Sequence, residues 1–136
     1  MTATSEHKVL IVDDELDFAE TVVECLELRG FHAKSAGDAN EAMALIKSGW
    51  RPEVVILDLK MPGVNGLEAL NLIKAHDPSI QVIIATSHGS TSDGIEGMHR
   101  GLFDYLMKPV EINELVRMIN EAIAQNATRR GGPAEE

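Results

Sequence analysis

A regular alternation of short apolar runs with longer amphipathic segments is the feature that most constrains the fold of this chain. Five runs show no helical period and are predicted to be strands, at 8–12, 31–36, 53–57, 80–85 and 102–107. Because one helix-like segment follows each run and the connections are short, the pattern favours parallel strands joined by right-handed crossovers. The sequence therefore predicts an α/β protein whose sheet is covered on both faces.

The helices are predicted from apolar spacing and from start and stop signals. The first stops at Gly30, and the second begins after the capping residue Asp38 and ends at Gly49. A third follows the strand at 53–57, a short weak one lies within 90–101, and the last covers 111–125. The apolar residues that define the four stronger helices are Leu16, Ala19, Val22, Val23, Leu26, Ala42, Leu45, Ile46, Leu67, Leu70, Ile73, Leu115, Met118, Ile119 and Ala122. The expected fold is a doubly wound, five-stranded parallel sheet of flavodoxin-like order 2-1-3-4-5, a three-layer sandwich.

The chain has 136 residues, the size of one domain with its own core. We expect an N-terminal extension at 1–7, a folded domain at 8–126 and a disordered tail at 127–136, because the last segment is rich in glycine and ends in acids. The single cysteine, Cys25, lies in a helical pattern and is predicted to be a packed thiol.

Composition narrows the function classes. No apolar run approaches the roughly 18 residues that cross a membrane, and no signal-peptide pattern precedes the first strand, so a cytoplasmic protein without a membrane partner is expected. The formal net charge of −10 argues against direct contact with nucleic acid but leaves a basic protein surface as a suitable partner.

Chemically capable side chains follow four of the predicted strands. These residues are Asp13 and Asp14, Asp58, Thr86 and Ser87, and Lys108 and Pro109. In the predicted order those four strands are neighbours, so their carboxyl ends meet at one edge of the sheet. Three carboxylates together repel one another unless a cation binds among them, and Mg²⁺ prefers such oxygen ligands. The alternative is that these side chains merely solubilise loop ends.

The motifs at these positions resemble the receiver domain of bacterial two-component response regulators. The resemblance covers residues 8 to about 125 and rests on "VDDE", "LDLKMPGVNGLE", "IIATSHGS" and "FDYLMKPV", which occur in the family's order and spacing. By this resemblance Asp58 is the phosphoacceptor, which takes a phosphoryl group from a sensor histidine kinase. The same resemblance implies a Mg²⁺ site made by Asp13, Asp14, Asp58 and the backbone carbonyl of Lys60, and no other cofactor.

The resemblance also implies roles around the phosphoryl group. Lys108 would pair with a phosphoryl oxygen, and Pro109, after a cis peptide bond, would fix its approach. Thr86 would hydrogen-bond a further oxygen, and small Ser87 would leave room for it. The "MPGVNG" loop, in which Gly63 and Gly66 permit tight backbone geometry, would shape the wall of the site. Tyr105 occupies the switch-aromatic position, for which an ordinary amphipathic ring at the margin of the sheet is the alternative.

The leading interpretation is a signalling switch, either free-standing or part of a longer regulator, that catalyses only its own phosphorylation and dephosphorylation. Its partners would be a sensor histidine kinase or phosphotransfer protein and a downstream protein or effector domain. Output, and possible dimerisation, would use the surface of the fourth helix, fifth strand and fifth helix. The enzyme alternative is a Mg²⁺-dependent phosphohydrolase that acts through an aspartyl phosphate, although its usual DxD motif is here DLK. A flavodoxin-like cofactor binder is disfavoured because "VDDELD" is acidic where phosphate would bind.

Overall fold

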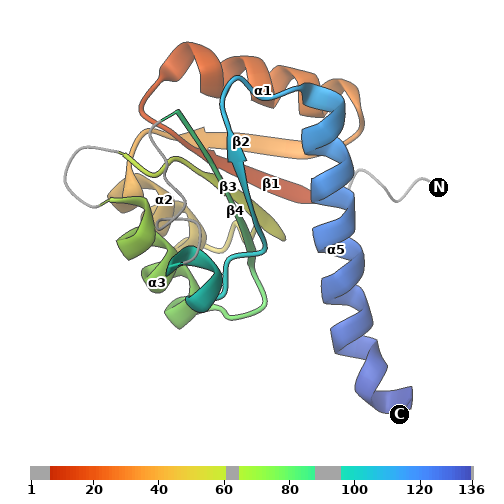
Figure 1. The fold of residues 1–136 in the computed structure, drawn as a ribbon. Coiled ribbons are helices and arrows are strands. Elements are labelled where there is room, and N and C mark those ends of the chain that lie inside the picture. The colour runs from red at the N-terminus through yellow and green to blue at the C-terminus, as the bar shows by residue number, and fades with distance from the viewer. Residues whose placement is uncertain (1–6, 61–64, 88–95, 136) are drawn as a thin grey trace.

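A single parallel sheet forms the centre of the protein (Figure 1). The computed structural model describes residues 7–60, 65–87 and 96–135, with side chains to residue 126. The strands are β1 (Lys8–Val12), β2 (His32–Ala36), β3 (Val54–Leu57), β4 (Gln81–Thr86) and β5 (Asp104–Met107). They pair in parallel in the order β2-β1-β3-β4-β5, which confirms the predicted fold class and strand order.

Helices cover both faces of the sheet, as the doubly wound topology requires (Figure 1). Their bounds are α1 (Leu16–Leu28), α2 (Ala39–Lys47), α3 (Gly66–His76) and α5 (Ile112–Glu135). One apolar cluster joins the sheet to α2 and α3, and a second joins its other face to α1 and α5. Of the predicted fourth helix, residues 96–99 are helical, and 90–95 lie outside the described residues. No helix within the described ranges is both long and apolar enough to cross a membrane.

Three residues predicted to begin or end helices do so in the structure. The Asp38 side chain accepts a hydrogen bond of 2.8 Å from the Glu41 backbone N–H at the start of α2. Gly30 and Gly49 end their helices with positive φ angles of 93° and 110°, a conformation that favours glycine. Asn65, which the sequence analysis did not single out, caps α3 by accepting from Glu68 N at 3.0 Å.

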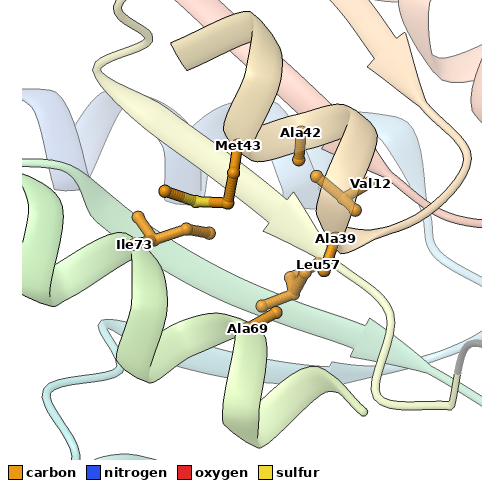
Figure 2. Close-up of a pocket in the computed structure, with 7 residues that line it drawn as sticks. All are labelled: Val12, Ala39, Ala42, Met43, Leu57, Ala69 and Ile73. Carbon is orange, nitrogen blue, oxygen red and sulfur yellow. The ribbon is translucent and has the colours of Figure 1, made fainter. Parts of the chain in front are cut away.

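The core confirms most of the predicted apolar faces, with one error. Figure 2 shows Met43 of α2 and Ile73 of α3 directed toward one another, with Leu57 of β3 lining the same gap, which is too narrow to hold a water molecule. Leu16, predicted to belong to the apolar face of the first helix, is 61% exposed. It is the first residue of α1, one turn before Ala19, the first residue of the helix to be buried against the sheet.

The last helix is longer than predicted. It runs to Glu135 instead of ending at Gln125, so the backbone of 127–135, which was expected to belong to a disordered tail, is helical. Two buried amides hold the helix at the base of the sheet as far as residue 126: Gln81 donates to Gln125 Oε1 at 3.0 Å, and Asn126 donates to the Ser79 carbonyl at 2.7 Å. No glycine or proline interrupts 112–130, which favours a helix over that range.

The end of α3 is tied to the loop before β3 by a polar network. The Asp77 carboxylate accepts hydrogen bonds from Arg51 and from both the backbone and the hydroxyl of Ser79. Burial alone would raise the pKa of Asp77, but these hydrogen bonds outweigh burial and lower it from 3.8 to about 2. A carboxyl whose pKa is lower in the folded state stabilises the fold above its unfolded pKa, and this contribution is lost as the pH falls through the folded value.

We therefore expect Asp77→Asn to lower the free energy of unfolding at pH 7 by about 1 kcal/mol, because the amide keeps the shape and loses the charge. The difference from the wild type should shrink as the pH falls from about 5 to 2, since the wild-type carboxylate then becomes protonated. Urea unfolding across this pH range measures both effects. Asp17→Asn, at an exposed aspartate of α1, is the control, and an equal effect of both substitutions would refute the role of the network.

Candidate functional site

Strand register places two aspartates side by side at the carboxyl end of the sheet. Val12 of β1 is in register with Leu57 of β3, so Asp13 and Asp58 leave their strands at the same level. The Asp13 N–H donates to the Ala36 carbonyl and the Asp58 N–H donates to the Val12 carbonyl, both at 2.9 Å. The backbone is thus held by the sheet up to each carboxylate, and the two residues are only 2% and 4% exposed.

Three carboxylates form one cluster at this edge. One carboxylate oxygen from each of Asp13, Asp14 and Asp58 lies within 4.8 Å of the other two, with Asp14 the exposed member. Oδ1 of Asp58 is buried and has no hydrogen-bond partner among the described residues. Burial of an unpartnered carboxylate oxygen is unfavourable, and a hard divalent cation is the kind of partner that satisfies it. The cluster therefore fits Mg²⁺, in agreement with the predicted donor set.

Lys108 brings a positive charge to the cluster from the end of β5. Its Nζ lies 2.8 Å from Asp13 Oδ2 and 2.5 Å from Glu15 Oε1, and 4.2 Å from the centroid of the Phe18 ring. Its backbone N–H donates to the Thr86 carbonyl at 2.9 Å, which fixes its position relative to β4. Among the described contacts, its ammonium makes ion pairs with Asp13 and Glu15 and none with Asp58.

The protonation of the pair reflects burial and a surplus of acids. Burial raises the pKa of Asp13, hydrogen bonds from Lys108 and from the Glu15 N–H lower it in part, and repulsion by Asp58 raises it further. Burial alone would lower the pKa of Lys108, but hydrogen bonds to Asp13 and Glu15 outweigh it, so that pKa is raised. A single ammonium facing several carboxylates stays charged while it neutralises them incompletely.

The remaining predicted site residues surround this cluster. Thr86 is fully buried as the last residue of β4, and Ser87 after it is exposed. The Lys108-Pro109 peptide bond is cis, as the resemblance implied. Tyr105 in β5 is partly buried against the core beneath α2 and α3. Lys60 is exposed, and ligation by its backbone carbonyl remains a prediction, while Gly63, predicted to shape the adjoining loop, lies outside the described residues.

Sequence reasoning missed two residues that shape the site. Glu15 and Phe18 contact Lys108, and although the motif "VDDE" contains Glu15, spacing alone did not assign this contact.

Gly66 lies where α3 comes closest to the end of the strand that carries Asp58. The Gly66 N–H donates to the Leu59 carbonyl at 2.6 Å, and a Cβ at Gly66 would lie 2.5 Å from the backbone oxygen of Asp58. The tight backbone geometry predicted at this glycine is therefore present.

Comparison with known proteins identifies the family. The family model described as "Response regulator receiver domain" matches residues 9–120. The chain therefore belongs to the receiver domains of two-component response regulators, proteins that act as signalling switches rather than as general catalysts. This confirms the family suggested by the sequence motifs.

Several relatives show the range of proteins that carry this domain. The DNA-binding response regulator MtrA of Mycobacterium tuberculosis is 32% identical over 123 residues, which cover 90% of this chain and 53% of MtrA. The nitrogen assimilation regulatory protein NtrX of Azorhizobium caulinodans is 35% identical over 126 residues, 91% of this chain and 28% of NtrX. A solved receiver domain from Clostridium thermocellum superposes with a TM-score of 0.84 at 34% identity, and the match covers 89% of this chain and 97% of that one. The chain thus spans about half of MtrA and under a third of NtrX.

Proposed function

We propose that this receiver domain is switched by transfer of a phosphoryl group to Asp58 from a phosphohistidine of a sensor histidine kinase or phosphotransfer protein. The observation that carries the proposal is the buried Oδ1 of Asp58, which lacks a hydrogen-bond partner in the described structure and lies beside two further carboxylates. A structural aspartate at a strand end would be satisfied by neighbouring donors. An unsatisfied Oδ1 supports instead a site that a bound cation would complete.

The transfer is a displacement at phosphorus. An oxygen of Asp58 attacks the phosphorus atom, the bond between phosphorus and the imidazole nitrogen breaks, and that nitrogen keeps the electron pair. Asp58 becomes an acyl phosphate. Asp13, Asp14, Asp58 and the Lys60 carbonyl would hold Mg²⁺, which when bound supplies positive charge against the repulsion between carboxylate and phosphate.

The other residues would orient the phosphoryl group once it is on Asp58. Lys108 would pair with one phosphoryl oxygen, on a backbone that Pro109 and the hydrogen bond to Thr86 hold in place. The Thr86 hydroxyl would donate to another oxygen, and the small side chain of Ser87 would leave the mouth of the site open. Dephosphorylation is the corresponding attack by water on phosphorus, which restores the carboxylate and releases phosphate.

Output would follow from Thr86 and Tyr105. Movement of Thr86 toward the phosphoryl group would let Tyr105 turn inward and bias the surface formed by 88–100, β5 and α5 between two states. Met98 and Met107 on this surface are 53% and 51% exposed, which suits docking of a downstream protein, an effector domain or a second copy. The segment 88–100 is predicted to be the least protected regular element of the unphosphorylated protein, because Gly94 and Gly97 weaken a short helix. Residues 88–95 of this segment lie outside the described residues.

The setting we propose is the cytoplasm, and this domain would make no direct contact with nucleic acid because its net charge is −10. MtrA is named for DNA binding, but this chain matches only 53% of it. A phosphohydrolase that acts through an aspartyl phosphate is the second candidate, favoured only by the carboxylate cluster itself.

Incubation with acetyl phosphate and Mg²⁺ tests the proposal. We expect intact-protein mass spectrometry to show one phosphoryl group per chain, and labelling to require Mg²⁺. Multiple turnover of small phosphate esters without a lasting labelled species would favour the hydrolase instead. Absence of both labelling and phosphate release, with small phosphodonors and with a histidine kinase, would contradict both candidates.

A further inference from the structure

Glu15 and Phe18 lie beside the ammonium group that the proposed reaction needs. We propose that they are positioning residues that hold Lys108 away from Asp58 in the unphosphorylated protein and so oppose engagement of the phosphoryl group. This inference rests on the proposed function of Asp58, because it concerns the choice of Lys108 between these partners and a phosphoryl oxygen.

The ammonium group of Lys108 already contacts three side chains. The side chain of Lys108 is only 9% exposed, and its Nζ contacts Asp13 at 2.8 Å, Glu15 at 2.5 Å and the face of the Phe18 ring at 4.2 Å. All three partners come from the segment that joins β1 to the first turn of α1. The ammonium is therefore held on the α1 side of the cluster by two carboxylates and an aromatic face.

The Glu15 side chain does not cap helix α1, although Glu15 occupies the N-cap position. It is the N-cap residue of α1, where short polar side chains ordinarily accept a hydrogen bond from the first turn, yet it makes no such bond. Its carboxylate instead contacts Lys108, which lies 93 residues further along the chain. A glutamate in this position is explained by the contact with lysine rather than by helix capping.

Engagement of a phosphoryl group on Asp58 requires Lys108 to change partners. Lys108 forms ion pairs with Asp13 and Glu15 and none with Asp58 among the described contacts, so a phosphoryl oxygen on Asp58 would compete with these two partners for the ammonium. Glu15 is the partner most easily released, because its side chain is 59% exposed while that of Asp13 is 2% exposed. Loss of the Glu15 contact or of the Phe18 ring face should therefore favour the engaged state.

Beryllofluoride in the presence of Mg²⁺ serves as the probe, because it forms a phosphoryl-like group on a carboxylate. We expect Glu15→Gln to bind it about fivefold more tightly than the wild type, and Phe18→Leu about threefold more tightly. Glu20→Gln is the matched control: it removes the same charge from an exposed glutamate of α1 that has no ion pair in the described structure. NMR titration measures the affinity of all four proteins, and thermal unfolding checks that each is folded.

The three variants separate the possible causes. If beryllofluoride affinity rises in Glu15→Gln but not in Phe18→Leu, loss of negative charge and not release of Lys108 changes the affinity. That result would overturn the inference. So would equal affinities of Glu15→Gln and Glu20→Gln. Failure of the wild type itself to bind beryllofluoride with Mg²⁺ would instead count against the proposed function. If Phe18→Leu is unfolded, Phe18→Met, which fills a similar volume without a ring face, takes its place, and wild-type affinity of a folded Phe18→Met would overturn the inference.

Discussion

Replacement of Asp58 by asparagine is expected to abolish labelling by acetyl phosphate, because the amide cannot attack phosphorus and removes one of the three carboxylates of the cluster. The shape of the side chain is unchanged, so the fold should be kept. Mass spectrometry after incubation with Mg²⁺ and the phosphodonor should show the unmodified mass, whereas the wild type gains one phosphoryl group. Persistent stoichiometric labelling of the variant would show that another residue is the acceptor.

The same substitution should stabilise the protein in the absence of Mg²⁺. Asp58 is 4% exposed and adds repulsion to a buried neighbour, Asp13, whose pKa burial already raises. Removal of one of these buried charges is expected to raise the free energy of unfolding by about 1 to 2 kcal/mol in EDTA. Excess Mg²⁺ should stabilise the wild type and leave the variant almost unchanged. Urea unfolding with and without Mg²⁺ measures this, with Asp17→Asn on the exposed face of α1 as the control.

Much of the site could be predicted because parallel topology converts sequence position into spatial position. Alternation of strands and helices predicted a parallel sheet, and with the flavodoxin-like strand order the residues after β1, β3, β4 and β5 meet at one edge. Asp13, Asp58 and Lys108 lie where this argument placed them, since hydrogen bonds from the sheet fix the backbone up to these residues. The prediction depends on the backbone alone and needs no knowledge of rotamers.

The side-chain partners of Lys108 could not be predicted from strand order. The contact of Lys108 with Glu15 depends on a flexible side chain that chooses among several carboxylates within reach, and strand order does not rank them. The end of α5 also depends on a tertiary contact: Asn126, one residue past the predicted end at Gln125, is buried and donates to the Ser79 carbonyl, which helical spacing alone does not predict. Leu16 fitted the helical period but lies in the first turn of α1, beyond the contact with the sheet.

Outside the carboxylate cluster, Gly66 is the position where we expect an added methyl group to lower stability most. A Cβ there would lie 2.5 Å from the Asp58 carbonyl oxygen and 2.6 Å from the Leu59 Cα. Both are backbone atoms, so a side-chain rotation cannot relieve the clash. Alanine is a better helix former than glycine by about 1 kcal/mol, but overpacking against backbone costs about 1 to 3 kcal/mol and here involves two contacts. Gly66→Ala is therefore expected to lower the free energy of unfolding by about 2 kcal/mol.

The substitution should also affect Asp58, the proposed phosphoacceptor, because relief of the clash requires α3 to move from the Asp58-Leu59 peptide or that peptide to shift within the site. We expect Gly66→Ala to slow labelling by acetyl phosphate at least tenfold, even at temperatures where the variant is fully folded. Gly37→Ala is the matched control, since its Cβ would lie 3.4 Å from the flexible Glu41 carboxylate and needs no positive φ. That control should change stability by no more than about 0.5 kcal/mol and leave labelling unaltered. Wild-type labelling in a destabilised Gly66→Ala would show that the close approach of α3 supports the fold without positioning Asp58.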